Sequence, residues 1–365
     1  MKRILFVVGA RPNFMKIAPI MEAMSRYANA FEQLLVHTGQ HYDANMSQVF
    51  FDELGLPKPD LNLQVGSGSH AQQTAQVMQR FEPVLLEYKP DWIVVPGDVN
   101  STLACALVAS KLGIKIAHVE AGLRSFDRTM PEEINRVLTD QISDMLLTPS
   151  EDANANLRHE GIPQERIHFV GNVMIDTLVR LLPKAAERWP TLAHYYGLDR
   201  FVLVTLHRPS NVDRTDTLAE IVHALNTIAA EIPIIFPIHP RTRKRIDSLG
   251  LTLDQQRIYL LEPLSYLDFL AVQAHAQLVL TDSGGVQEET TYLGIPCLTI
   301  RANTERPVTI TQGTNILVNH NTGALVTAIE HFLDPTFRRQ NNYQPPRYWD
   351  GTAAERIAAS LYNSR

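Results

Sequence analysis

The sequence of 365 residues lacks the features that mark several large classes of protein. Its only two cysteines, Cys105 and Cys297, lie in apolar stretches, which predicts a cytoplasmic protein without a disulfide framework. No apolar run approaches the roughly 18 residues that span a bilayer. Arg11 and Lys16 interrupt the apolar start before it resembles a full signal peptide. The net charge of −6 argues against nucleic-acid binding, which needs a basic surface.

Several nucleotide and hydrolase signatures are missing too. Neither a GxxxxGK[ST] phosphate loop nor a GxSxG nucleophile elbow occurs. "GSGS" at 66–69 lacks the third glycine of a dinucleotide-binding fingerprint. His37 and His41 are four residues apart, but the glycine between them disfavours the helix that metal ligation at this spacing requires. We therefore expect no metal site and no ATP-driven chemistry.

What the sequence does contain is a regular alternation of short apolar runs and helical stretches. Continuous Val, Ile and Leu runs between helices are typical of parallel strands buried on both faces. The runs form two series, which predict an α/β protein with two doubly wound, Rossmann-like domains. The expected strands lie at 3–10, 33–39, 91–98, 114–122, 144–150 and 166–172, and at 200–207, 233–240, 257–263, 277–285 and 295–301.

The stretch 180–200 has two prolines and no strand pattern, and it separates the two series. We place an N-terminal domain at 1–175 and a C-terminal domain at 176–345. The tail, 346–365, ends in a short amphipathic pattern. One interpretation is that this tail crosses back to the N-terminal domain.

One stretch, "LVLTDSGGVQEETTYLGIPCL" at 278–298, predicts a strand that turns directly into a helix. Ser283, Gly284 and Gly285 occupy the turn. Glycines let the backbone approach a ligand closely, and the free N–H groups of a helix start attract phosphate. We interpret the turn as a phosphate-binding site. The alternative is an ordinary tight turn in which Ser283 caps the helix.

Charged residues and glycines follow almost every predicted strand. Because ligands of doubly wound sheets bind beyond the carboxyl ends of the strands, we expect these residues to line a cleft. In such a cleft, arginines can neutralise a diphosphate. The charged residues and histidines of the expected cleft are Arg11, Lys16, His41, Asp98, Glu120, His207, Arg208, His239, Arg241, Glu262, Asp282, Arg301 and Arg306. Taken singly, each has a simpler explanation, with Asp98 and Glu120 as helix caps and His207 as a core histidine.

Seven motifs occur in order: "GARPNFMKIAP" (9–19), "PGDVNSTLA" (96–104), "HVEAGLRS" (118–125), "MPEEINR" (130–136), "GN" (171–172), "DSGGVQEE" (282–289) and "TERP" (304–307). In this combination the chain resembles the non-hydrolysing UDP-N-acetylglucosamine 2-epimerases, from its first strand to about residue 315. The resemblance implies the GT-B architecture, with a UDP-sugar bound in the cleft between two domains. It also implies interconversion of UDP-GlcNAc and UDP-ManNAc for surface polysaccharide precursors, without a cofactor and usually in a homodimer.

The resemblance also implies roles for individual residues. The expected catalytic residues are Asp98, Glu120, Glu132 and His207. The residues expected to bind the UDP-sugar are Arg11, Lys16, His239, Arg241, Phe269, Ser283, Gly284, Gly285, Glu289 and Arg306. Among these, the Ser283 turn should hold the diphosphate, Glu289 the ribose hydroxyls and Phe269 the uracil.

The chain departs from the family pattern at four places. It has Gly-Ala-Arg-Pro-Asn at 9–13 where Gly-Thr-Arg-Pro-Glu is usual, and "HRPSN" at 207–211 lacks a glutamate. Val308 follows "TERP" in place of glutamate. Gln40-His41-Tyr42-Asp43 replaces a Gln-His-Arg stretch that contacts a second, activating UDP-GlcNAc in bacterial members. These changes resemble the branch that epimerises modified sugars.

Four alternatives therefore stay open beside epimerisation of UDP-GlcNAc. The first is a 2-epimerase of UDP-2,3-diacetamido-2,3-dideoxyglucuronate, and the second is a hydrolysing epimerase that releases free ManNAc and UDP. The third is a GT-B glycosyltransferase, which passes the sugar to an acceptor. The fourth is a non-catalytic sensor of nucleotide sugars.

Overall fold

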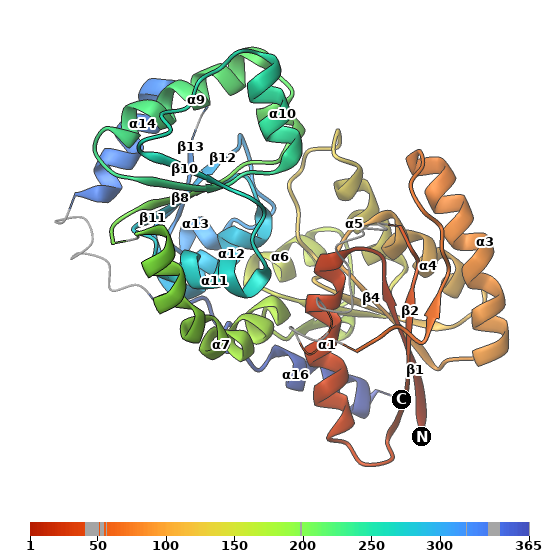
Figure 1. Cartoon of the computed structure of the whole chain (residues 1–365). Coiled ribbons are helices and arrows are strands. Elements are labelled where there is room, and N and C mark those ends of the chain that lie inside the picture. The colour runs from red at the N-terminus through yellow and green to blue at the C-terminus, as the bar shows by residue number, and fades with distance from the viewer. Residues whose placement is uncertain are drawn as a thin grey trace. The chain divides into compact units, whose positions relative to one another are not determined.

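A computed structural model describes residues 1–40, 51, 55, 57–197, 199–318, 320–334 and 344–364 of the chain. They form two compact units, each built on a parallel sheet (Figure 1). The first unit comprises Met1–Thr177 and Arg347–Arg365, and the second comprises Leu178–Pro346. None of the helices in the described part of the chain is long and apolar enough to cross a membrane.

The first unit has a seven-stranded sheet in the order β3-β2-β1-β4-β5-β6-β7. Its strands are β1 (Lys2–Val8), β2 (Phe31–His37), β3 (Leu61–Asn62), β4 (Trp92–Pro96), β5 (Lys115–Val119), β6 (Met145–Thr148) and β7 (Ile167–Phe169). Its helices are α1 (Arg11–Ser25), α3 (His70–Tyr88), α4 (Asn100–Lys111), α5 (Pro131–Ile142), α6 (Glu151–His159), the 3-10 turn η1 (Gln164–Arg166) and α16 (Ala353–Asn363). The strand order reverses between β1 and β4, which is where doubly wound sheets bind ligands.

The second unit has a six-stranded sheet in the order β10-β9-β8-β11-β12-β13, which reverses between β8 and β11. Its strands are β8 (Val202–Thr205), β9 (Ile234–Pro237), β10 (Ile258–Leu261), β11 (Leu278–Thr281), β12 (Cys297–Ile300) and β13 (Asn315–Val318). Its helices are α8 (Pro209–Val212), α9 (Thr215–Ala229), α10 (Pro240–Ser248), α11 (Tyr266–His275), α12 (Gly284–Leu293), α13 (Val308–Thr311) and α14 (Thr322–Leu333). Helix α7 (Val173–Tyr196) begins in the first unit and continues into the second.

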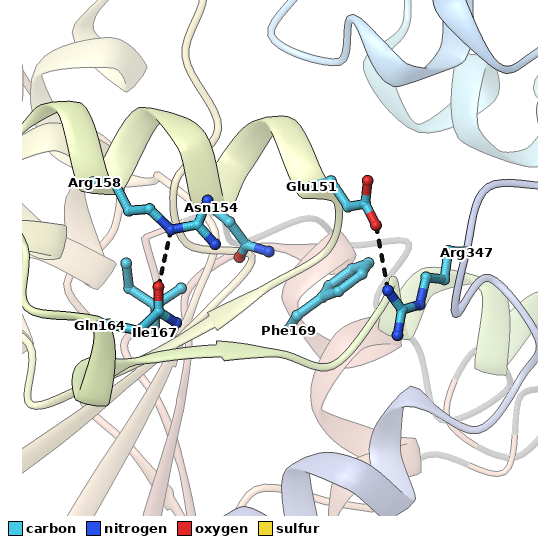
Figure 2. Close-up of a pocket in the computed structure, with 7 residues that line it drawn as sticks. All are labelled: Glu151, Asn154, Arg158, Gln164, Ile167, Phe169 and Arg347. Carbon is cyan, nitrogen blue, oxygen red and sulfur yellow. Dashed lines mark hydrogen bonds and ion pairs between the residues drawn. The ribbon is translucent and has the colours of Figure 1, made fainter.

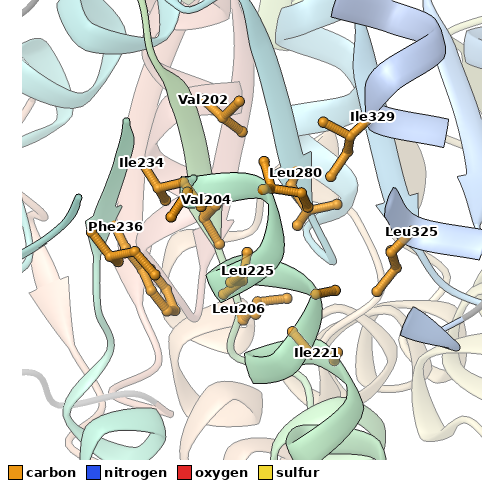
Figure 3. Packing of buried hydrophobic residues seen from close by; sticks show 14 of the residues in the cluster. Val202, Val204, Leu206, Ile221, Leu225, Ile234, Phe236, Leu280, Leu325 and Ile329 are labelled. Atoms are coloured by element: carbon orange, nitrogen blue, oxygen red, sulfur yellow. The ribbon is translucent and has the colours of Figure 1, made fainter. Parts of the chain in front are cut away.

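The second sheet is buried on both faces, as the continuous apolar runs predict. Val202 and Val204 of β8 pack in a hydrophobic cluster with α9 and α14, part of which Figure 3 shows. Leu203, between them, belongs to a cluster on the opposite face with residues of α11 and α12. Because successive strand residues point to opposite faces, a strand covered on both sides has to be apolar throughout.

The predicted α/β fold of two doubly wound domains is confirmed, and every predicted strand overlaps an observed one. The apolar runs did not predict two edge strands, β3 and β13. Strand β3 is two residues long and both are exposed, and β13 is buried at its two ends but not at the two residues between them. Neither has the continuous apolar run that identifies a strand buried on both faces. The stretch 180–200 is helical as far as Tyr196, within α7.

The C-terminal tail packs within the first unit, where α16 lies against α1. The Trp349 indole donates a hydrogen bond of 2.9 Å to the Pro149 carbonyl. Asp176 accepts hydrogen bonds from the first N–H groups of α16, and burial raises its pKa to about 6. Gly171 of the "GN" motif has φ +87°, and a Cβ there would collide with the Tyr348 carbonyl. The tail itself therefore requires this glycine.

Candidate active site

The first unit gathers polar residues where its strand order reverses. The Asn13 oxygen accepts hydrogen bonds from the N–H groups of Gly9 (3.0 Å) and Ala10 (2.9 Å). The Asn13 amide donates to the Pro96 carbonyl at 3.3 Å. Asn13 is one of the departures from the family pattern, and here it ties the end of β1 to the end of β4.

Glu120 follows β5 in a strained backbone conformation. Its φ of +72° lies in the left-handed region, which residues with long side chains seldom adopt. Its buried carboxylate forms an ion pair with Lys16 of α1. Gly97, also left-handed, leaves room for the pair, because a Cβ there would lie 3.1 Å from Lys16 Nζ. Such strain persists where the surrounding structure enforces it, often at active sites.

Asp98 lies at the same edge of the sheet, directly after β4. Its carboxylate forms an ion pair with Arg136 of α5, and its carbonyl accepts a hydrogen bond of 2.9 Å from Asn135. The N-cap of α4 is Val99, so the interpretation of Asp98 as a helix cap is wrong. Helix α5 instead holds both the side chain and the backbone carbonyl of Asp98.

Glu132 and Glu133 are adjacent at the start of α5 but differ in their surroundings. Glu133 is buried, where it accepts from the Ser125 N–H at 3.0 Å and pairs with Arg136 at 2.7 Å. Glu132 is exposed and precedes Arg136 by one helical turn, so the two lie on the same side of α5. The structure thus gives Glu133 a structural role and leaves Glu132 accessible beside the Asp98 ion pair.

His118 of β5 lies fully buried behind this edge, and both ring nitrogens contact acceptors. Nδ1 is 2.6 Å from Asp140 Oδ1, and Nε2 is 2.8 Å from the Gly97 carbonyl. Burial alone raises the pKa of Asp140, but the charges and hydrogen bonds of His118 and Arg124 hold it below its ordinary value. An ionised carboxylate and a carbonyl can only accept, so both ring nitrogens of His118 are placed to donate. The ring thereby fixes the turn that carries Asp98.

In the second unit, the turn between β11 and α12 contains the predicted phosphate site. Ser283 occupies the N-cap position of α12, but its side chain makes no capping hydrogen bond. The interpretation of its hydroxyl as a helix cap is therefore wrong. Ser283 precedes the first N–H groups of the helix, where an anion is stabilised.

The two glycines of this turn are explained differently. A Cβ at Gly284 would lie 2.6 Å from Arg306 Nη1 and 3.0 Å from Glu305 Oε1, so the protein's own packing requires glycine. A Cβ at Gly285 would meet nothing within 4 Å. Packing within the unit does not explain a glycine at 285, whereas close approach of a ligand would.

Three arginines surround the buried carboxylate of Glu305. Arg301 pairs with it at 2.7 Å, Arg306 contacts it directly, and Arg208 Nη2 lies 4.0 Å away. Arg306 also pairs with Glu288 at 2.7 Å. Burial, together with the nearby positive charge of Arg301, lowers the pKa of Arg208. The three guanidinium groups gathered here supply N–H donors that suit a phosphate.

His207 follows β8 and pairs with Asp282, which follows the neighbouring strand β11. Its Nδ1 lies 2.9 Å from Asp282 Oδ1, and half of its side chain is exposed, whereas Asp282 is fully buried. The interpretation of His207 as a core histidine is therefore wrong. Although burial alone raises the pKa of Asp282, its hydrogen bonds and the nearby charge of His207 keep it below its ordinary value.

Glu289, expected to bind the ribose, is buried in α12. Its carboxylate accepts a hydrogen bond of 2.8 Å from the Tyr266 hydroxyl. Burial raises the pKa of Glu289 to about 7. Phe269 lies one turn after Tyr266 in α11 and is half-buried against the same hydrophobic cluster as Val286 of α12.

Three predicted residues, Arg11, His239 and Arg241, are exposed. Arg241 pairs with Asp213 at the surface, and its N–H donates to His239 Nδ1 at 3.1 Å, so His239 caps α10. Arg11 begins α1. Their proposed contacts with substrate rest on the family pattern alone.

The two histidines considered for metal binding differ in what the structure describes. His37 is buried, its ring centroid lies 5.5 Å from that of Phe14, and burial lowers its pKa. His41, Tyr42 and Asp43 lie outside the described residues. Within the described part of the chain, no group of three or more His, Cys, Asp or Glu side chains is arranged to hold a metal ion.

A pocket of about 460 Å³ lies in the first unit among α6, β7 and Arg347 of the tail (Figure 2). Glu151 and Arg347 face each other across it at 3.5 Å, and Phe169 lies beside them. None of the predicted site residues lines this pocket. It is therefore separate from the candidate active site.

Comparison with known proteins identifies the family of the chain. A family model described as UDP-N-acetylglucosamine 2-epimerase matches residues 23–362. The chain belongs to this family. It is 45% identical to the UDP-N-acetylglucosamine 2-epimerase of Methanocaldococcus jannaschii, over 98% of each chain. A crystal structure of the M. jannaschii enzyme in complex with UDP-GlcNAc and UDP has a TM-score of 0.90 and covers 99% of this chain and 100% of that one.

A second relative bears on the substrate. The chain is 43% identical to the UDP-2,3-diacetamido-2,3-dideoxy-D-glucuronate 2-epimerase of Pseudomonas aeruginosa, over 98% of this chain and 99% of that one. Family membership confirms the predicted family and makes the chain an epimerase, which is an isomerase. Its GT-B neighbours confirm the predicted fold class.

The sequence analysis assigned no role to several residues that shape the site. They are Asn13, His118, Arg136, Asp140 and Glu305, and each lies within or near a motif. One signal was available, because His118 is a lone histidine inside an apolar strand and so required buried partners. Asp140 is distant in sequence and polar like its neighbours, so only the fold reveals it as that partner.

Proposed function

We propose that the chain interconverts UDP-GlcNAc and UDP-ManNAc by eliminating UDP and adding it back, without a cofactor. The observation that carries this proposal is the full-length similarity to an epimerase whose structure contains UDP-GlcNAc and UDP. The two residue clusters support it, since one is rich in carboxylates and the other gathers arginines around a helix start.

The C2 hydrogen of an N-acetylhexosamine is not acidic, so the reaction begins at C1. The C1–O bond breaks, its electron pair leaves with UDP, and C1 becomes oxocarbenium-like. A base then removes the C2 proton, and the C–H electron pair forms the C1=C2 bond of a 2-acetamidoglucal. Protonation of the opposite face of C2 and return of UDP to C1 complete the inversion.

In this proposal the two clusters perform different tasks. Asp98, Glu120 and Glu132 stabilise the cation and transfer protons, as carboxylates do in glycoside hydrolysis. Lys16 is held against Glu120, where it limits charge repulsion between the carboxylates and the diphosphate. The turn at 283–285 and Arg306 hold the departing diphosphate.

Incubation with UDP-GlcNAc in D₂O, followed by NMR, tests the reaction. We expect UDP-ManNAc with deuterium at C2 to form when neither an acceptor nor a nicotinamide cofactor is added. Retention of the original hydrogen at C2 would contradict elimination. Accumulation of free ManNAc would indicate a hydrolysing epimerase, and inertness without an acceptor would favour a glycosyltransferase.

The second candidate substrate is UDP-2,3-diacetamido-2,3-dideoxyglucuronate. The P. aeruginosa relative supports it, because its identity of 43% is close to the 45% of the M. jannaschii enzyme. Parallel measurements of kcat/KM on the two sugars decide between them. A ratio above about tenfold, or about 1.4 kcal/mol of transition-state binding, identifies the preferred substrate.

We also propose simple saturation kinetics, without activation by a second UDP-GlcNAc. The Gln40 side-chain oxygen accepts hydrogen bonds from the Ser101 N–H (2.9 Å) and hydroxyl (2.6 Å), so it is engaged inside the first unit. A sigmoidal rate curve would contradict this proposal.

Three finer expectations complete the proposed function. They are a homodimer, action in the cytoplasm and supply of an activated sugar for surface polysaccharide, and all rest on the family resemblance. Light scattering of the purified protein tests the first, because a dimer has twice the 41.0 kDa mass of the chain.

A further inference from the structure

We propose that Asp282 is a positioning residue that holds His207 in the Nδ1–H tautomer. This leaves Nε2 as the ring nitrogen that exchanges protons during the reaction. The tautomer is argued from the geometry of the second unit alone, whereas the proton-transfer role rests on the proposed function.

The two oxygens of Asp282 have different partners. Oδ2 accepts hydrogen bonds from the Arg208 N–H at 2.9 Å, the Asn211 amide at 3.1 Å and the His207 N–H at 3.1 Å. Oδ1 lies 2.9 Å from His207 Nδ1 and 3.2 Å from the His207 N–H. Backbone and amide donors thus fix Oδ2, and Oδ1 contacts the imidazole.

These contacts determine where the imidazole carries its proton. Asp282 is fully buried among donors, and its pKa is held below the ordinary value of 3.8, so it is ionised at neutral pH and can only accept. His207 Nδ1 must then donate. In the neutral ring the lone pair lies on Nε2, which makes no hydrogen bond within the described part of the structure.

Asp282 also links the imidazole to the phosphate turn. It directly precedes Ser283, and its carbonyl accepts a hydrogen bond of 3.1 Å from Arg208 Nε. One buried residue therefore fixes the ring, the Arg208 side chain and the start of the turn at the strand-order reversal between β8 and β11. A base held this way keeps its position when the diphosphate leaves.

The substitution Asp282→Asn makes a specific prediction about the ring. An amide has one acceptor oxygen, and we expect it to take the position of Oδ2, where three donors can bond to it. The NH₂ group then faces Nδ1 and donates to it, which moves the ring proton to Nε2. In a serine-protease triad the corresponding wrong tautomer lowers kcat by about 10⁴. We expect Asp282→Asn to lower kcat by about 10²–10⁴.

Nitrogen-15 NMR of the histidine rings tests the tautomer in the unmodified protein. A His207→Gln spectrum assigns the resonances. At a pH where the ring is neutral, we expect a protonated Nδ1 and an unprotonated Nε2, with the opposite pattern in Asp282→Asn. His118 is an internal reference, because both of its nitrogens should remain protonated. A protonated Nε2 in unmodified neutral His207 would overturn the proposal.

Asn211→Ala is the matched control for loosening of the turn. It removes a donor from Oδ2 and the 3.0 Å hydrogen bond to the Ile300 carbonyl, but leaves the contact between Oδ1 and Nδ1. We expect an unchanged tautomer, a kcat within about tenfold of the parent and UDP affinity within about tenfold in both variants. If Asn211→Ala lowers kcat as far as Asp282→Asn, or if Asp282→Asn loses UDP binding, Asp282 is merely structural. If the unmodified protein epimerises neither sugar, the proposed function fails, and the spectrum alone decides the tautomer.

Discussion

Each unit contains a histidine–aspartate pair at the carboxyl edge of its sheet, and the two pairs differ in one respect. In the first unit, His118 and Asp140 are both fully buried, and both ring nitrogens are bonded. In the second, Asp282 is buried, but half of the His207 side chain is exposed and only Nδ1 is held. A ring with both nitrogens engaged serves a structural role, whereas a ring with one nitrogen held and the other accessible can transfer a proton.

The same contrast extends to the surroundings of each pair. His118 supports the turn that carries Asp98, so the first unit uses its buried pair to place carboxylates. Asp282 adjoins the turn proposed to bind phosphate, so the second unit places an imidazole close to that turn in sequence and structure. The units share a strand order but differ in charge at the functional edge, which predicts that chemistry and nucleotide binding separate by mutation.

The largest expected effect is on turnover through the first unit. Asp98→Asn, Glu120→Gln and Glu132→Gln keep shape but remove charge and basicity. Each should lower turnover by about 10²–10⁴. UDP affinity, measured by calorimetry on the same preparations, should change by less than about tenfold. Equal losses of binding and turnover would mean that the two tasks are not divided between the units.

The next largest effect is on stability and sharpens the contrast between the pairs. Asp140→Asn leaves the charge of Arg124 without this buried partner and removes an ionised acceptor from His118 Nδ1, which should lower the free energy of unfolding by about 3–5 kcal/mol. The control is Asp350→Asn, whose partner Arg356 lies nearer the surface, where a pair contributes about 1 kcal/mol or less. Urea denaturation measures both. Similar losses in the two variants would contradict a special role for the buried pair.

Much of this arrangement follows from the sequence, and the remainder depends on tertiary contacts. Apolar runs predicted every strand that is buried on both faces, because burial dictates composition there. The motif at 282–285 predicted a phosphate turn, because glycine and a helix start act locally. The partners of His118 and His207 were not predictable from residue type alone. Asp140 is 22 residues from His118 and reaches it because α5 packs against β5. Asp282 is 75 residues from His207 and reaches it because β11 pairs with β8.

The third prediction compares the two glycines of the phosphate turn. Gly284→Ala should lower stability by about 1–3 kcal/mol, because its Cβ displaces the Arg306 guanidinium. Gly285→Ala meets no protein atom, so stability should hold while UDP binding weakens by about tenfold. Thermal unfolding and calorimetric titration of both variants provide the measurement. Unchanged UDP affinity in Gly285→Ala would remove the reason to place the diphosphate against this turn.

The smallest expected effect concerns the proton on Glu289. Burial raises its pKa from 4.5 to about 7, so the folded protein keeps this proton at pH values where the unfolded chain has lost it. The resulting penalty is absent below pH 4.5, grows as pH rises and is complete above about pH 7. Glu289→Gln should therefore stabilise the protein relative to the parent more at pH 8 than at pH 5.

The same proton should be linked to UDP binding, because ribose hydroxyls donate best to an ionised carboxylate. If UDP binds only ionised Glu289, with its pKa of about 7, affinity should fall about tenfold between pH 8 and pH 6. Calorimetry in buffers of different ionisation enthalpy should then record proton release near pH 7. Glu289→Gln retains the titration of the nucleotide itself, so subtracting its pH dependence isolates the contribution of Glu289. A parent and variant with the same pH dependence would show that Glu289 does not contact the ribose.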